Sequence, residues 1–322
     1  MKETANLTNF KSDVEMISGS AEVLRSLLHK HRLDGIELML CAPWDPDVFP
    51  EGLIVGNHLP FYPNWMDFWM GETEVIETEF GSAENIVAQF GGLTQDAWLE
   101  RYRRQILEAA ETGPEYMVFH VGNARYRETF SWDFHYDDEA VIEATLALLH
   151  ELSDCIPNDT WLLLENLWWP GLRLTDQRLT DRILSASPHS KTGIMLDTGH
   201  LLATDRSVRT QEEGAEYIHR VLTGLGETRK MIKGVHLHQS LSGDYLRKQK
   251  GNVPETLTMR AVAEHIHHID YHAPWSTPAV QAALQSIVPS WITHEFLQQN
   301  LEHWDTQLKI QTHALRKHER NA

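Results

Sequence analysis

The chain has 322 residues, of which 42% are hydrophobic and 23% charged, so it can bury a sizeable core as an ordinary globular protein. Its formal net charge of −18 argues against tight binding to long nucleic acid, because proteins that bind a duplex usually carry a basic stripe. Two distant cysteines, no apolar run long enough to span a membrane, and an N-terminus without the apolar core of a signal peptide predict a cytoplasmic protein without a disulfide framework.

Short apolar runs alternate with amphipathic stretches along the chain, a pattern typical of a parallel sheet covered by helices. A weak first strand is expected near 6–10, followed by seven clearer strands at 35–40, 53–59, 116–121, 160–167, 193–196, 232–238 and 291–296. Helices are expected between them, among others at 20–31, 96–111, 138–152, 211–225, 258–270 and 300–318. No glycine-rich dinucleotide fingerprint follows a strand. The order predicts an α/β fold, a single (β/α)8 barrel that spans residues 1–322 as one domain.

Two long loops are expected at the rim of this barrel. Residues 60–80 are rich in aromatic side chains, and residues 239–257 are polar and include three basic residues. Long loops in compact domains often act as lids or binding loops.

The predicted strands end in residues of the types that bind metals. In a parallel barrel the carboxyl ends of all strands lie on one face, where catalytic residues gather. Six strands deliver such residues to that face: His58, His120, Glu165, Asp197 followed by His200, His236 with His238, and Glu295. A carboxylate at the end of an apolar strand is costly to ionise alone, and a divalent cation removes that cost. Mixed imidazole and carboxylate ligands suit zinc, manganese, iron or cobalt rather than calcium.

Four segments carry a resemblance to a known group of barrels. LLLEN (162–166), LDTGH (196–200), GVHLHQS (234–240) and THEF (293–296) resemble the xylose isomerase-like TIM-barrel superfamily, which includes sugar isomerases, epimerases and the endonuclease-four class of apurinic endonucleases. The resemblance covers strands five to eight by motif and the first half by pattern. It implies a metal-binding quartet, which here would be Glu165, Asp197, His236 and Glu295. The pattern of some epimerases favours His238 in place of His236, and Gln239 stands where an aspartate is common.

The resemblance to the endonuclease-four class implies a larger site. Enzymes of that class hold three zinc ions with nine ligands, and the additional ligands here would be His58, His120, His200, Asp270 and His272. The last two lie at the end of a histidine-rich helix, so a solvated helix terminus is an equal alternative for them. The cofactor expected is one to three divalent ions per chain, of zinc, manganese or iron.

Three functions remain open from the sequence. A multinuclear cluster suits hydrolysis of a phosphoester, with Glu165 and Asp197 as the central carboxylates. A sugar isomerase or epimerase would use Glu165 and Glu295 as acid and base, with His200 on a substrate oxygen. A non-catalytic metal-binding barrel is the third. The ligand number favours hydrolysis, and the charge favours a small sugar or phosphoester over nucleic acid; a homo-oligomer is compatible with the sequence.

A few other residues invite interpretation. Glu37 is expected to face the barrel interior as a substrate contact, a support for the site, or a structural ion pair. Asn166 could orient Glu165, and Trp168 and Trp169 could wall the pocket. His294 should point to the face opposite Glu295, because side chains alternate along a strand.

Overall fold

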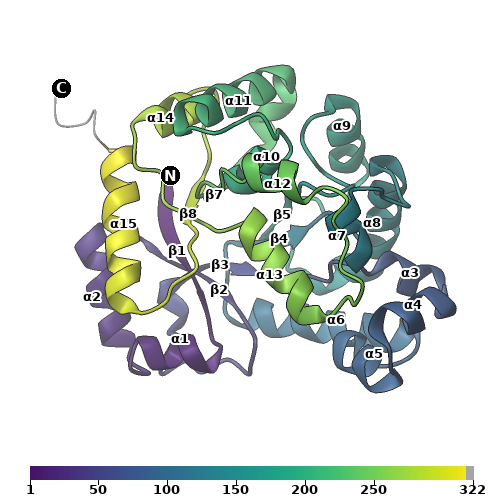
Figure 1. The fold of residues 1–322 in the computed structure, drawn as a ribbon. Helices are drawn as coiled ribbons and strands as arrows, with labels where there is room; N and C mark the ends of the chain where they lie inside the picture. Colours follow the sequence, from purple (N-terminus) through teal and green to yellow (C-terminus); the bar gives the residue numbers. More distant parts are fainter. Residues whose placement is uncertain (317–322) are drawn as a thin grey trace.

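A computed structural model describes residues 1–316 as a closed barrel of eight parallel strands in the order of the sequence, with each strand paired to the next and β8 paired to β1 (Figure 1). The predicted (β/α)8 barrel is therefore confirmed. The strands are β1 Lys2–Thr8, β2 Gly35–Met39, β3 Ile54–His58, β4 Tyr116–His120, β5 Trp161–Glu165, β6 Thr192–Asp197, β7 Ile232–Leu237 and β8 Trp291–His294.

The main helices lie outside the barrel and cover it. They are α2 Ala21–His31, α6 Gln95–Glu111, α8 Asp138–Leu152, α9 Gln177–Ala186, α11 Gln211–Gly224, α14 Ala279–Leu284 and α15 Leu301–Leu315. Side-chain caps begin several of them; Thr94 accepts from the Ala97 N–H at the start of α6, for example. The predicted helix 300–318 ends earlier, at Leu315, and its last two residues lie outside the described part of the chain.

The first strand lies about four residues before its predicted position. The prediction depended on the apolar residues of 6–10, but Phe10 is exposed and precedes the short helix α1 (Lys11–Met16). The strand itself carries polar residues that are satisfied inside the fold. Thr4 exchanges a hydrogen bond with Thr293, and Asn6 donates to the carbonyl oxygen of Phe296. Such a strand has little hydrophobic signal, although it closes the barrel.

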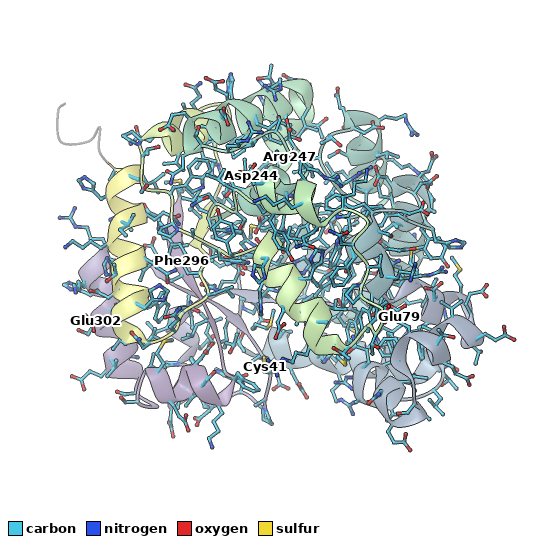
Figure 2. The ribbon with its side chains drawn as sticks, in the orientation of Figure 1. Cys41, Glu79, Asp244, Arg247, Phe296 and Glu302 are labelled. Atoms are coloured by element: carbon cyan, nitrogen blue, oxygen red, sulfur yellow. The ribbon has the colours of Figure 1, made fainter. Side chains whose placement is uncertain are left out.

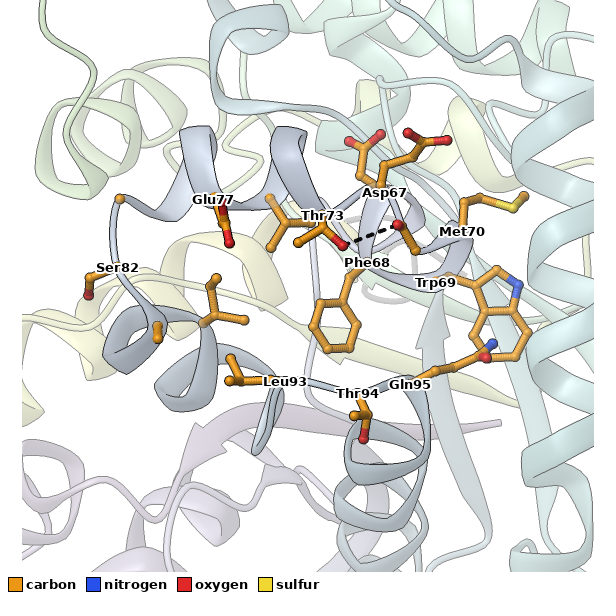
Figure 3. A pocket seen from close by; sticks show the side chains of 16 residues that line it. Asp67, Phe68, Trp69, Met70, Thr73, Glu77, Ser82, Leu93, Thr94 and Gln95 are labelled. Atoms are coloured by element: carbon orange, nitrogen blue, oxygen red, sulfur yellow. Dashed lines mark hydrogen bonds between the residues drawn. The ribbon is translucent and has the colours of Figure 1, made fainter.

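The prediction of a long loop at 60–80 is wrong. This segment and its continuation form three short helices, α3 Met66–Met70, α4 Thr73–Phe80 and α5 Ala83–Phe90. Gly71, Gly81 and Gly91 end them with φ angles of 76°, 74° and 82°, values that only glycine adopts freely. Helices of five to eight residues are too short to show a clear helical period. Together they line a cavity of about 600 Å³ with residues from 67–95 (Figure 3).

The connection from β7 to β8 crosses the face of the barrel with two helices, α12 Gly243–Gln249 and α13 Met259–Ile269 (Figure 1). The segment 239–257 is therefore only partly a loop. Figure 2 shows Asp244 and Arg247 of α12, which form an ion pair. α13 is fixed to the short helix α7 (Tyr126–Ser131), because His265 donates from Nε2 to the Thr129 carbonyl oxygen at 2.9 Å.

None of the helices within residues 1–316 is both long enough and apolar enough to cross a bilayer.

Candidate metal centre

The centre of the site is the carboxylate of Glu165 at the end of β5, whose side chain is 1% exposed. Its Oε2 lies 3.2 Å from Nε2 of both His58 and His120, at the ends of β3 and β4. Its Oε1 lies 3.3 Å from Nδ1 of His200 and 3.2 Å from Nδ1 of His236. Each oxygen thus faces a different pair of histidines.

A second group surrounds His236 on β7. Its Nδ1 lies 3.2 Å from Glu295 Oε2 and 3.8 Å from Asp197 Oδ2, in addition to Glu165. The four residues of the expected quartet are therefore together. His238, the alternative to His236, is also buried here and contacts Asp197 at 2.9 Å through Nε2. Because His236 touches two of the three carboxylates at 3.2 Å, the geometry favours it over His238 for the quartet.

The third group is the one that the sequence left open. Asp270 Oδ2 lies 3.1 Å from His200 Nε2 and 2.7 Å from His272 Nε2, so these three residues meet at the centre. The Ser240 hydroxyl donates to the other oxygen of Asp270 at 3.0 Å. Asp270 and His272 do not form a solvated helix terminus, because Asp270 is only 7% exposed and contacts His200, which follows β6.

Local hydrogen bonds select which nitrogen each histidine offers. His58 donates from Nδ1 to the Leu59 carbonyl oxygen at 2.9 Å, and His200 donates from Nδ1 to that of Asn166 at 2.9 Å. Both rings therefore present Nε2 on the opposite side. Asp197 is held as the N-cap of the short helix α10 (Thr198–Ala203), because its Oδ1 accepts a hydrogen bond from the His200 backbone N–H at 2.6 Å.

The carboxylates and imidazoles shift one another's pKa values. Burial raises the pKa of Asp197, but the neighbouring His200 and His238 outweigh burial and bring the pKa down to about 2. Burial lowers the pKa of His272, but Asp270 and Glu295 outweigh it and raise the pKa to about 9. Burial also raises the pKa of Glu295 above its usual range, despite the neighbouring histidines. The site is a dense, buried network of opposite charges.

The donor set fits divalent metal ions. Residues 1–316 provide no hydrogen-bond partner for four buried atoms here: Nδ1 of His120, His238 and His272, and Oε2 of Glu295. Buried polar atoms rarely remain unsatisfied, so their concentration at one place indicates a missing group. Five sets place their ligand atoms within 4.8 Å of one another: His58, His120 and Glu165; Glu165, Asp197 and His236; His200, Asp270 and His272; His238, His272 and Glu295; and Glu37, His58 and His236.

Aromatic side chains cover this centre. Phe61 lies over the His120 ring with centroids 4.4 Å apart, and Trp168 lies 5.0 Å from the His200 ring. Trp169 packs against both aromatic residues. Trp168 and Trp169 are each 2% exposed, so they wall the site closely, as the sequence suggested.

Other sequence interpretations have mixed outcomes. Asn166 does not orient Glu165; it bonds both backbone groups of Asp197, at 3.0 and 2.8 Å, and thereby ties β5 to β6. His294 points away from the site, as predicted, and contacts Glu3 at 3.2 Å.

Comparison with known proteins identifies the family of this barrel. The family model described as "Xylose isomerase-like TIM barrel" matches residues 85–284, more than half of the chain. The chain belongs to this family. The sequence resemblance to xylose isomerase-like barrels is thereby confirmed. Of the nine expected ligands and His238, the matched region contains all but His58 and Glu295. The comparison with curated proteins finds no match.

Several solved structures share the fold of this xylose isomerase-like barrel at low sequence identity. Endonuclease IV from Thermus thermophilus aligns with a TM-score of 0.54 and 16% identity, covering 98% of this chain and all of that one. A D-tagatose 3-epimerase-like protein aligns with a TM-score of 0.52 and 16% identity over the full length of both chains. The 3-keto-D-glucoside 4-epimerase of E. coli aligns with a TM-score of 0.50 and 13% identity, covering 96% and 98%. At these identities the likeness shows the fold alone. The three solved structures are named as an endonuclease, an epimerase-like protein and an epimerase.

Proposed function

We propose that the protein is a divalent-metal-dependent hydrolase of a small phosphoester. The observation that carries the proposal is the meeting of eleven ligand-type side chains in adjoining sets, enough for more than one ion, and these sets include all nine expected ligands. Ions held in such a site act as Lewis acids and stabilise the charge that develops on phosphoryl oxygens. The expected ligands are His58, His120, Glu165, Asp197, His200, His236, Asp270, His272 and Glu295.

The chain itself would perform three tasks in this reaction. Glu165 holds two pairs of histidines at a fixed distance, because each of its oxygens faces one pair. Asp197 is anchored at the start of α10 through Oδ1 and presents its other oxygen, Oδ2, to His238 and His236. Trp168 and Trp169 limit access and exclude water, which strengthens the electrostatic interactions inside. A closely walled site within an acidic protein favours a small substrate over a nucleic acid duplex.

Metal content tests this proposal directly. We expect two or three zinc, manganese or iron equivalents per wild-type chain, and loss of at least one in His58→Ala and His120→Ala. His313→Ala, a change at an exposed position of α15, is the matched control and should retain all of them. Wild-type protein should hydrolyse a member of a panel of small phosphoesters and leave an abasic-site duplex intact. A single equivalent that is insensitive to both histidine changes contradicts the multinuclear site.

A sugar isomerase or epimerase is the second candidate, and one contact favours it. The carboxylates of Glu165 and Glu295 lie at the same distance, 3.2 Å, from Nδ1 of His236, so two potential proton-transfer groups face one position. In this function the two glutamates act as acid and base, and His200 binds a substrate oxygen. Turnover of a ketose panel with one metal equivalent would support it. Bound metal without turnover on either panel would instead support a non-catalytic barrel.

A further inference from the structure

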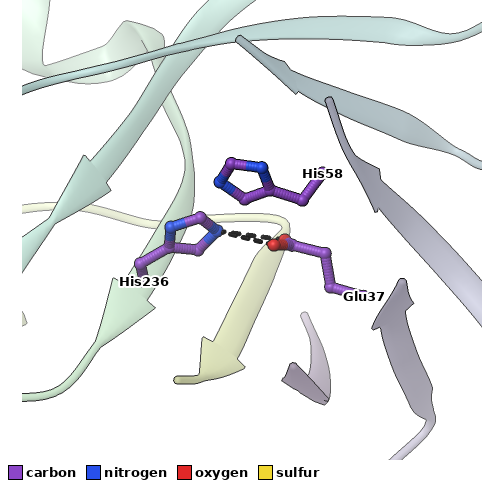
Figure 4. Close-up of side chains that lie close together, drawn as sticks. All are labelled: Glu37, His58 and His236. Atoms are coloured by element: carbon purple, nitrogen blue, oxygen red, sulfur yellow. Dashed lines mark hydrogen bonds and ion pairs between the residues drawn. The ribbon is translucent and has the colours of Figure 1, made fainter. Parts of the chain in front are cut away.

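Glu37 lies inside the barrel beneath the ligand residues, in the middle of β2, and its side chain is 1% exposed. Its Oε1 lies 2.9 Å from Nε2 of His236, and Figure 4 shows the carboxylate pointing at that ring, with His58 above. Its Oε2 accepts hydrogen bonds from the Tyr116 hydroxyl at 2.8 Å and the Thr293 hydroxyl at 3.1 Å. A buried charge held by this many donors has one fixed position.

The local backbone makes room for this arrangement. Gly56 on β3 faces Tyr116, and a Cβ atom at that position would lie 2.1 Å from the tyrosine ring. The glycine therefore lets the ring cross the barrel interior to reach Glu37. Thr293 also lies 3.0 Å from the tyrosine hydroxyl, so β2, β4 and β8 are joined at this carboxylate.

His236 presents opposite sides of its ring to two different environments. Nε2 faces Glu37, whereas Nδ1 faces Glu165 and Glu295 at 3.2 Å each. The equivalent hydrogen bonds of His58 and His200 go to backbone carbonyl oxygens. Of these three contacts, only that of His236 Nε2 is made to a charged side chain.

We propose that Glu37 is the positioning residue of the metal centre: it accepts the Nε2 proton of His236, fixes that ring with Nδ1 toward the ions, and increases the electron density that Nδ1 offers them. The inference rests on the proposed metal centre and adds a residue outside its nine ligands. Glu37, His58 and His236 also lie close enough together to hold an ion of their own. In this proposal Glu37 instead accepts the Nε2 proton of His236, at 2.9 Å, and stands outside the nine ligands. A carboxylate behind a metal-bound histidine orients the ring and typically contributes 10- to 100-fold in metal affinity.

Metal affinity, measured by competition with a chelator of known affinity for Zn²⁺, tests the inference. Glu37→Gln keeps the shape of the side chain but removes its charge, and we expect the Zn²⁺ dissociation constant to rise about 10- to 100-fold. Tyr116→Phe is the matched control. It deletes another buried hydrogen bond to the same carboxylate and leaves the Glu37–His236 contact in place, so its Zn²⁺ affinity should equal that of the wild type.

Two further measurements separate positioning from folding. Urea unfolding of the metal-free proteins should show a similar loss of stability in both variants. Long-range ¹H–¹⁵N spectra of the Zn²⁺-loaded wild type should show His236 protonated at Nε2 only, a state that Glu37→Gln should weaken. If that variant fails to fold, Glu37→Asp, which withdraws the carboxylate from the ring, takes its place.

The outcomes are distinct. Wild-type affinity in the folded Glu37 variant overturns the inference, and so does an equal loss of affinity in Tyr116→Phe, which would assign Glu37 to packing alone. Failure of the wild-type protein to bind metal overturns the proposed function as well. A loss confined to the Glu37 variants supports the positioning role.

Discussion

At the scale of single residues, the site depends on how closely backbone and imidazole rings approach one another. Gly199 follows Asp197 in the first turn of α10, where the His238 ring packs directly on the backbone. A Cβ atom at Gly199 would lie 2.0 Å from Cε1 and 2.5 Å from Nδ1 of that ring. Since the ring also contacts Asp197 and stacks on His272 with centroids 4.0 Å apart, it has no room to withdraw.

Gly199→Ala should therefore displace His238 and disturb both Asp197 and His272. We expect a loss of about 1–3 kcal/mol in the free energy of unfolding, the usual cost of overpacking, together with weaker metal binding. Urea unfolding and chelator competition measure the two effects. Gly224→Ala, at the end of α11 where an added Cβ meets nothing within 4 Å, is the matched control. Equal behaviour of the two variants would show that the close approach at Gly199 is unimportant.

At the scale of elements, the first and last parts of the barrel are joined by one partly buried carboxylate. Glu3 on β1 lies 3.2 Å from His294 Nε2 on β8 and forms an ion pair with Arg316, next to the end of α15. Burial raises the pKa of Glu3, but the bonds to His294 and Arg316 outweigh burial and bring the pKa below its ordinary value of 4.5. The charged form is thus stabilised by folding.

The sign of the pH dependence follows from that shift. A carboxyl group whose pKa is lower in the folded protein contributes stability above its unfolded pKa, and the contribution disappears as the pH falls through the folded value. Glu3→Gln should therefore unfold more easily than wild type at pH 7, by about 1–2 kcal/mol, and the difference should shrink below pH 4.5. Urea unfolding between about pH 3 and 7 measures this. Glu216→Gln, at an exposed position of α11, should show no such trend, and a pH-independent difference for Glu3→Gln would contradict the argument.

Some elements and site residues can be predicted from the sequence and others cannot. The strand-end residues could be predicted, because apolar strands are conspicuous and a parallel barrel brings their carboxyl ends to one face. Asp270 could not be assigned in this way, since it follows α13 and not a strand, and only tertiary packing brings it to His200. The short helices α3 to α5 were missed because their glycine ends resemble a loop. The support that Glu37 gives His236 joins β2 to β7, a contact that no local pattern contains.

At the scale of the whole molecule, the candidate ligands come from or directly follow six consecutive strands, β3 to β8, apart from the pair that follows α13. Ions held by them would therefore cross-link most of the barrel at one end. A ligand that binds only the folded protein stabilises it by about 4 kcal/mol at a free concentration about 1,000 times its dissociation constant. The stability of the protein should accordingly depend on metal.

Chelation should lower the melting temperature of the wild-type protein, and Zn²⁺ or Mn²⁺ should restore it. Glu165→Gln removes the charge that faces all four central histidines, so its melting temperature should be low and insensitive to chelator. Differential scanning calorimetry with and without chelator gives the comparison. If the wild-type melting temperature does not respond to metal at any concentration, the cross-link does not form.

The aromatic wall has an optical consequence. The Trp168 ring lies 5.0 Å from the His200 ring, and the Trp169 ring lies 4.9 Å from that of Trp168. One of the 11 tryptophans is therefore in contact with the centre, and a second packs against it. Their emission should change as Zn²⁺ enters and His200 exchanges a proton for an ion. Trp168→Phe should abolish most of that change, whereas Trp304→Phe, on α15 outside the barrel, should retain it. If the protein binds Zn²⁺ as proposed, its own tryptophan fluorescence would report metal occupancy in a titration without any attached label.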